Sequence, residues 1–114
     1  MYNYIHPDTV TYLETISYWK DILTDIDTTH VINYIEIGSL HGGSLLHFHN
    51  TFGQHVRSIS IDPFSSCDGY VEYENEHNKN FEIYKINTEQ LGDKNIHIRK
   101  PSCEVLPLLK DNFL

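Results

Sequence analysis

The sequence predicts an α/β fold, in which a parallel sheet of strand order 3-2-1 carries flanking helices. Three short runs rich in β-branched residues are separated by segments of helical spacing, and a glycine-bearing turn follows the first run. This alternation is typical of βαβ units, whose crossovers are right-handed and whose strands are parallel. The 114 residues have room for one domain, residues 1–114.

Composition and charge argue against several classes of protein. Hydrophobic residues make up 39% of the chain, which is enough for a core, and 16 acidic against 8 basic residues give a net charge of −8. Without a basic face, nucleic acid is not expected as a partner. No run approaches the roughly 20 apolar residues of a membrane span, and the N-terminus does not resemble a signal peptide. We therefore expect a cytoplasmic protein without a membrane partner.

The first two expected elements are a helix at residues 8–24 and a strand at residues 31–37. Apolar residues recur at helical spacing in the first segment, and Pro7 is tolerated in a first turn. These apolar residues are Val10, Leu13, Ile16 and Leu23. The second segment is a largely apolar, β-branched run that ends at Gly38, as expected of a buried strand.

The next two elements are a helix of about ten residues and a second strand at residues 56–61. Leu45, Phe48 and Phe52 stand at helical spacing. Gly53 follows as a C-terminal cap. The second strand ends at Asp62-Pro63, because proline cannot extend a central ladder.

Residues 65–77 are expected to form a polar loop, in which the acidic residues Glu72, Glu74 and Glu76 are solvated. A helical face then resumes before Gly92, formed by Phe81, Tyr84, Thr88 and Leu91. A third strand is expected at residues 95–99, followed by a short apolar segment in which Pro107 argues against a long helix. Residues 31–109 thus form a βαβαβ unit.

The turn between the first strand and the following helix, residues 36–44 (EIGSLHGGS), is the stretch that carries chemistry. Glycine permits a tight turn there and lets a ligand approach the backbone. The dinucleotide pattern GxGxxG fails because Leu40 occupies its second glycine position, so an NAD-type oxidoreductase is the weaker reading. Asp62 ends the second strand, where an acidic side chain can accept hydrogen bonds from ribose hydroxyls. Turn and acid together predict a nucleoside site.

Residues 34–44 (YIEIGSLHGGS) and 60–64 (SIDPF) resemble the first two motifs of class I S-adenosylmethionine-dependent methyltransferases. The closest likeness is to the small type 24 group, which is related to sugar and cephalosporin-pathway enzymes. Residues 95–107 (NIHIRKPSCEVLP) are similar to that group's third strand and the S-x-E-x-L-P element after it. The resemblance covers about residues 31–109 and implies the N-terminal, cofactor-binding half of that Rossmann-like fold.

The resemblance also implies a set of residues that bind S-adenosylmethionine. They are Glu36, Gly38, Ser39, Gly43, Asp62 and Ser102. Glu36 would lie near the methionine moiety or order the turn, and the three turn residues would cradle the cofactor. Asp62 would hold the ribose, and Ser102 would lie near the adenine. In an intact relative the methyl group would pass to an oxygen or nitrogen of a small molecule or sugar.

Members of this group continue into a fourth strand with an Asp-Gly-x-His-like element that supplies catalytic or metal-binding side chains. The chain ends where that strand should begin, so we expect a truncated relative with no assigned catalytic residue. His41, in the turn, is the one nearby candidate for a base, although we expect it to be solvated. Glu36 would be costly to bury unpaired, so we expect it to face a polar crevice or hydrogen-bond the loop.

Two alternatives and one exclusion follow from the same residues. Without a fourth strand, residues 31–37 form an apolar sheet edge that invites self-association or a partner chain. The chain is then a non-catalytic, nucleoside-binding or edge-pairing fragment of a split or degenerate methyltransferase; an NAD-type fragment is the third reading. No metal site is expected, because His47 and His49 point to different faces of a helix, and Cys67 and Cys103 are isolated.

Overall fold

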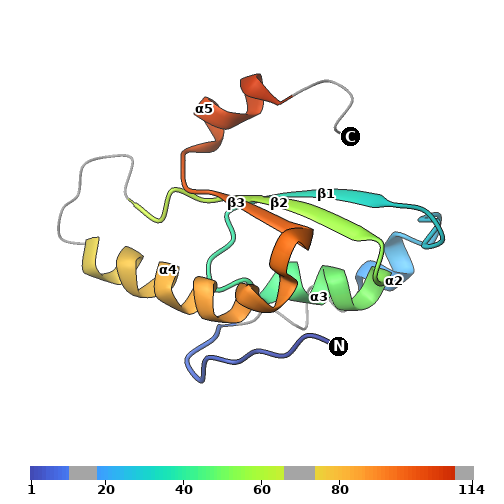
Figure 1. The fold of residues 1–114 in the computed structure, drawn as a ribbon, viewed down its shortest axis with the longest axis horizontal. Helices are drawn as coiled ribbons and strands as arrows, with labels where there is room; N and C mark the ends of the chain where they lie inside the picture. The colour runs from blue at the N-terminus through green and yellow to red at the C-terminus, as the bar shows by residue number, and fades with distance from the viewer. Residues whose placement is uncertain (11–17, 66–73, 110–114) are drawn as a thin grey trace.

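The computed structural model describes residues 1–10, 18–65 and 74–109, and all that follows concerns these ranges. Helices and strands alternate along them (Figure 1). The elements in order are α2 (Trp19–Ile22), β1 (Ile32–Ile37), α3 (Gly43–Phe52), β2 (Val56–Ile61), α4 (Glu74–Thr88), the 3₁₀ segment η2 (Glu89–Lys94), β3 (Asn95–Ile98), α5 (Ser102–Val105) and the 3₁₀ turn η3 (Leu106–Leu108).

The three strands form a parallel sheet in the order β1-β2-β3, which is 3-2-1 when read from the opposite edge. The helices α3 and α4 cover one face of the sheet, and α5 stands on the other (Figure 1). The expected α/β class, with a parallel sheet and flanking helices, is therefore confirmed. All three strands run in the same direction, so their carboxyl ends meet at one edge of the molecule.

Hydrophobic side chains fill the layer between the sheet and the two helices. One buried cluster joins α3 to α4 and η2, and a second joins α3 to the start of β2. Their buried members are Leu45, Leu46, Phe64, Tyr84 and Leu91 in the first and Phe48, Phe52 and Val56 in the second. Thus most of the residues whose spacing predicted these helices are buried on the helical face that packs against the sheet. Gly53 ends α3 with a φ of 92°.

The opposite face of the sheet carries isoleucine. The register places Ile35 beside Ile59 and Ile59 beside Ile96, and a second row repeats the pattern. The second row is Ile37, Ile61 and Ile98. Val105 of α5 packs on Ile59 and Ile61, whereas Ile37 and Ile96 remain more than half exposed.

The expectation of a helix at residues 8–24 was wrong for the described part of that segment. Only Trp19–Ile22 is helical there, and residues 8–10 are not. Residues 11–17 lie outside the described residues. Side chains distant in sequence instead hold the main chain before that segment: the amides of Ile5 and His6 donate to Asn87, and the amide of Val10 donates to the imidazole of His41 at 2.9 Å. Tertiary contacts outweigh helical spacing in so short a segment.

The polar loop expected at residues 65–77 was too long, because α4 already begins at Glu74. Glu76 is exposed as expected but lies in this helix, while Glu72 lies outside the described residues. The third strand ends one residue earlier than expected, at Ile98. The segment after it forms only short helical turns, in line with the break that Pro107 predicts.

A buried histidine joins α3 to the sheet. His49 is 2% exposed, and its Nε2 lies 2.8 Å from the hydroxyl of Ser58. Burial lowers the pKa of His49 to about 4, and the nearby charge of Lys94 acts in the same direction. The folded chain therefore holds this imidazole neutral.

We expect His49 to make the free energy of unfolding depend on pH. Above about pH 6.5 neither state binds a proton at His49, whereas between about pH 6.5 and 4 the unfolded chain alone binds one. Stability should fall by roughly 3 kcal/mol across this window as pH decreases. Urea unfolding at several pH values should show a smaller loss for His49→Gln than for the parent. His47→Gln, in the same helix but half-exposed, is the matched control; equal profiles for parent and His49→Gln would contradict this account.

Candidate functional site

The turn from β1 into α3 lies at the carboxyl ends of the strands and contains three residues in left-handed backbone conformation. These are Gly38 (φ 80°), Leu40 (φ 47°) and Gly42 (φ 79°). The amide of Gly38 still donates to the carbonyl of Ile61 at 2.9 Å, so the turn begins on the sheet itself. A Cβ added to Gly38 would meet nothing within 4 Å, so the turn is open on that side.

Asp62 holds this turn. Its Oδ2 accepts hydrogen bonds from the amides of Ser39 at 2.9 Å and Leu40 at 3.3 Å, and its Oδ1 accepts one from the amide of Phe64 at 2.8 Å. A carboxylate has about four acceptor positions, so about one remains for a ligand. The interaction that the structure shows for Asp62 is therefore with the turn, and it leaves room for one more donor.

Glu36 is buried behind the first turn of α3, with 6% of its surface exposed. Its Oε2 accepts hydrogen bonds from the hydroxyls of Tyr34 at 2.8 Å and Ser44 at 2.9 Å. As expected, the side chain is not buried without partners. Its Oε1, however, has none, and neither does the buried hydroxyl of Ser39. The two groups are neighbours that do not meet in hydrogen-bond geometry.

Burial raises the pKa of Glu36, and the negative charge of Asp62 raises it further. The hydroxyls of Tyr34, Ser44 and Ser39 lower this pKa, but burial is the largest cause. A positively charged donor beside Oε1 would supply the partner that this carboxylate lacks.

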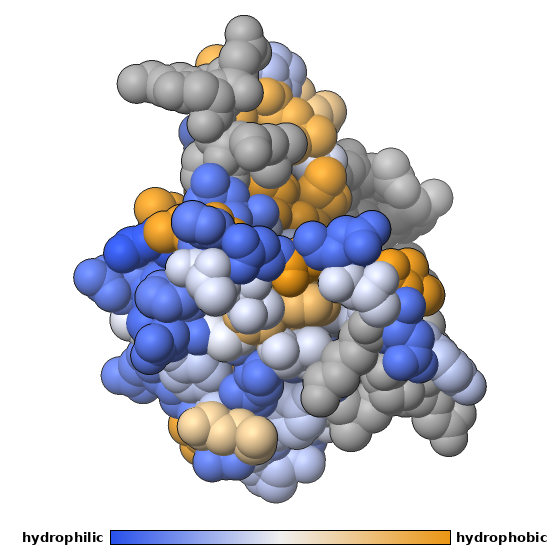
Figure 2. Space-filling model, turned by 90° about the vertical axis from the view of Figure 1, so that its right-hand side faces the viewer, coloured by the Kyte–Doolittle hydropathy of each residue, from blue (hydrophilic) through white to orange (hydrophobic). Residues whose placement is uncertain are grey.

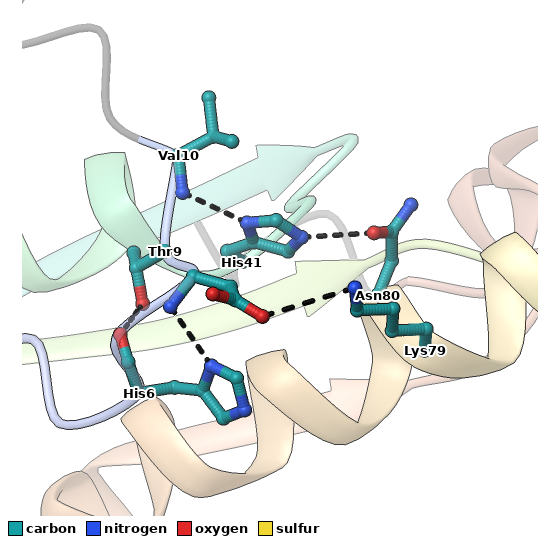
Figure 3. A network of polar contacts seen from close by, with 7 residues as sticks. His6, Thr9, Val10, His41, Lys79 and Asn80 are labelled. Carbon is teal, nitrogen blue, oxygen red and sulfur yellow. Dashed lines mark hydrogen bonds and ion pairs between the residues drawn. The ribbon is translucent and has the colours of Figure 1, made fainter.

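The expectation that His41 is solvated was wrong. The side chain is 5% exposed, its Nδ1 accepts the amide hydrogen of Val10 at 2.9 Å, and its Nε2 lies 2.9 Å from Oδ1 of Asn80 (Figure 3). An imidazole that accepts at Nδ1 and faces an amide oxygen at Nε2 carries its proton on Nε2. Both nitrogens are engaged, so His41 offers no free base.

Two further glycines start α3. A Cβ on Gly42 would lie 2.8 Å from Cγ2 of Thr88, so α4 approaches the turn as closely as only glycine permits. Gly43 is buried, and its carbonyl accepts a hydrogen bond from the hydroxyl of Tyr4 at 3.3 Å. Sequence reasoning did not assign this packing role to Gly42, because Thr88 lies 46 residues further along the chain and gives no local signal.

The turn borders a small pocket of about 90 Å³. Its lining residues are Val10, Gly38, Ser39, Leu40, His41, Gly43 and Ser44. Three of the predicted cofactor residues thus come together, whereas Glu36 and Asp62 act on the turn and Ser102 is not in the lining. Ser102 is half-buried in the first turn of α5, beyond the end of β3. Val10 was not predicted here, since it comes from a segment distant in sequence.

A larger hollow, of about 430 Å³, lies near the amino ends of the strands, away from this turn. It is lined by Met1, Tyr2, His49, Asn50, Gly53, Gln54 and Lys94. It is larger than the pocket at the turn, but it holds neither the turn nor the acid, and Lys94 already contacts the Tyr2 hydroxyl at 3.2 Å. The turn is the better candidate site.

Within the described ranges, no group of three or more His, Cys, Asp or Glu side chains is arranged to hold a metal ion. Cys103 is a free, exposed thiol, and Cys67 lies outside those ranges. Among the same residues, none of the helices has both the length and the apolar character needed to cross a bilayer.

We expect Gly42→Ala to destabilise the chain more than Gly38→Ala. Both residues have φ near 80°, so both substitutions strain the backbone by about 1–2 kcal/mol, but only the Cβ at position 42 meets Thr88. Urea unfolding should show a larger loss for Gly42→Ala. Adding Thr88→Ser, which removes Cγ2 and keeps the hydroxyl that donates to Tyr84, should recover part of it. Equal losses of unfolding free energy for Gly38→Ala and Gly42→Ala would show that α4 does not approach the turn in this way.

Comparison of the chain with protein-family models, with curated proteins and with solved structures finds no match. The structural features that bear on function are the turn, Asp62 and the unpartnered groups beside them.

Proposed function

We propose that the chain is an S-adenosylmethionine-binding, methyltransferase-like domain and that the turn at residues 38–43 is its cofactor site. The observation that carries the proposal is the pairing of this turn with Asp62 at the carboxyl ends of two neighbouring parallel strands. In open α/β sheets, ligands bind in the crevice at that edge. The remaining acceptor position of Asp62 suits a ribose hydroxyl.

The direction of the turn amides favours this cofactor over a dinucleotide. A pyrophosphate binds to free main-chain N–H groups at a helix start. Here the amides of Ser39 and Leu40 donate to a carboxylate, which would also repel a phosphate. S-adenosylmethionine has no phosphate group, and its ribose and adenine are uncharged, so the negative charge of Asp62 does not oppose the part of the cofactor that would lie beside it.

The groups without partners fit the amino-acid end of the same molecule. Oε1 of Glu36 and the hydroxyl of Ser39 are buried and unpaired beside the pocket's wall. An α-ammonium group donates three hydrogen bonds and carries a positive charge, and both properties suit these atoms. When bound, the cofactor supplies an electrophilic methyl group, and the residues named here bind and orient it.

The pocket's size supports a site that surrounds only part of the ligand. About 90 Å³ is well below the roughly 300 Å³ from which small-molecule sites usually start, so this chain surrounds one part of the ligand. We therefore expect transfer of the methyl group to an oxygen or nitrogen of a small molecule or sugar only where a more complete site surrounds the ligand. No base is assigned, because both nitrogens of His41 are engaged.

Calorimetric titration with S-adenosylmethionine and S-adenosylhomocysteine tests the proposal. We expect binding to the parent, weakened about 10- to 100-fold by Asp62→Asn and by Glu36→Gln, because each removes a charge-assisted hydrogen bond of about 1.5–3 kcal/mol. NAD should not compete. Asp93→Asn, at an exposed position in η2, is the control. A folded, monodisperse parent that binds neither ligand would overturn the proposal.

A second function, pairing with another chain through β1, is favoured by the geometry of that strand. Amides of alternate residues point to the same neighbour, and those of Ile32 and Gly38 donate to the carbonyls of His55, directly before β2, and of Ile61 in β2. The main-chain groups of Ile35 and Ile37 therefore point to the other side, where the described residues supply no strand. Figure 2 shows apolar surface in the upper half of the molecule, on the side of the sheet that carries α5.

For this second function we expect self-association that increases with concentration and that Ile37→Lys abolishes. A lysine on an edge strand opposes pairing with another strand. Ile22→Lys makes the same change at an exposed site in α2 and should associate like the parent. Sedimentation velocity over a wide concentration range measures this. If the parent is monomeric at every concentration, the hypothesis of self-pairing through β1 is contradicted.

A further inference from the structure

Residues 1–10 run along the outer side of α3 and α4, away from the sheet (Figure 1). Side-chain amides hold their main chain. Asn50 of α3 binds both main-chain groups of Tyr2: its Oδ1 accepts from the amide at 2.8 Å and its Nδ2 donates to the carbonyl at 2.9 Å. Gln90 of η2 binds both groups of Asn3 in the same way, at 3.0 and 2.6 Å. The segment is thus bound as an extended peptide would be.

Asn87 of α4 connects this segment to the turn. Its Oδ1 accepts from the amides of Ile5 at 2.8 Å and His6 at 3.0 Å. Its Nδ2 donates to the hydroxyl of Thr9 at 2.7 Å and to the carbonyl of His41 at 2.9 Å. The side chain is fully buried, and all four of its hydrogen-bonding positions are used. One side chain therefore binds both the N-terminal segment and the middle of the turn.

A second connection runs through the imidazole of His41 (Figure 3). It accepts from the amide of Val10 on one side and contacts Asn80 of α4 on the other, both at 2.9 Å. By contrast, the ion pair between Lys79 and Asp8 spans 3.8 Å between exposed side chains and contributes little. The buried connections therefore decide where Val10 lies, and Val10 is a wall of the pocket at the turn.

We propose that residues 2–10 are a strap that completes the ligand site, with Asn87 and His41 as the positioning residues that couple it to the turn. The ligand part of this inference rests on the proposed function. Docking of the strap orders the turn through the carbonyl and imidazole of His41 and closes one side of the pocket. Because coupling between two sites is reciprocal, a ligand bound at the turn must also hold the strap more firmly.

The substitution Val10→Pro tests the coupling, because it removes the amide hydrogen that His41 accepts. Val10→Ala keeps that hydrogen and is the matched control. Amide hydrogen exchange without ligand should become at least severalfold faster at Ser39 and Leu40 in Val10→Pro and stay near the parent rate in Val10→Ala. Thr9→Val, which removes the hydroxyl that Asn87 binds, should act like Val10→Pro and covers the case in which proline prevents folding. If the amides of Ser39 and Leu40 exchange at the parent rate in both Val10→Pro and Thr9→Val, the proposal is overturned.

A second experiment, with ligand, distinguishes failure of this inference from failure of the proposed function. S-adenosylhomocysteine should bind Val10→Pro about tenfold more weakly than Val10→Ala, within the usual range of coupling between sites. It should also slow exchange of the Ile5 and His6 amides in the parent. If the parent binds no S-adenosylhomocysteine, the proposed function fails, while the ligand-free exchange rates still decide whether the strap positions the turn. Equal affinity in Val10→Pro and Val10→Ala would overturn the strap's role in the site.

Discussion

The hydrogen bonds between the carboxylate of Asp62 and the turn are the contacts on which the rest of the site depends. Asp62 stands at the end of β2 and binds two amides of the turn that follows β1, so it joins the ends of two strands at the point where α3 begins. The amide of Gly38 also donates to the carbonyl of Ile61 at 2.9 Å, which joins the start of the turn to the end of β2. Where the turn lies then determines where α3 begins and where His41 meets the strap.

Internal contacts at this edge use most of the polar groups, and the few that remain restrict the kind of ligand that we propose for the turn. Asp62 binds amides that a phosphate would need, and His41 has a partner at each nitrogen. Beside the turn, what remains is one acceptor position on Asp62, Oε1 of Glu36 and the hydroxyl of Ser39, and Nε2 of His97 in β3 is also buried without a partner. The groups beside the turn are acceptors or hydroxyls in a negatively charged setting, which suits a cationic, hydroxyl-bearing ligand better than an anionic one.

The part of the fold that sequence reasoning predicted is the part with local signals. The bounds of β2, the glycine cap of α3 and the turn beside Asp62 follow from β-branched runs, from Gly53 and from Pro63. The strap could not be predicted in this way. Its bonds join main-chain groups to amide side chains more than 45 residues away, and such pairs leave no periodic pattern. The helical spacing around Val10 pointed to a helix instead, and tertiary contacts outweighed it.

The most direct measurement is a titration of the isotope-labelled chain with S-adenosylhomocysteine, followed by the amide resonances in solution. We predict that the changes concentrate at residues 38–44 and 62–64, extend to the strap at residues 5–10, and spare the hollow beside Lys94 at the amino ends of the strands. Changes centred on that hollow, or none at ligand concentrations far above those of ordinary cofactors, would contradict the assignment of the turn as the site.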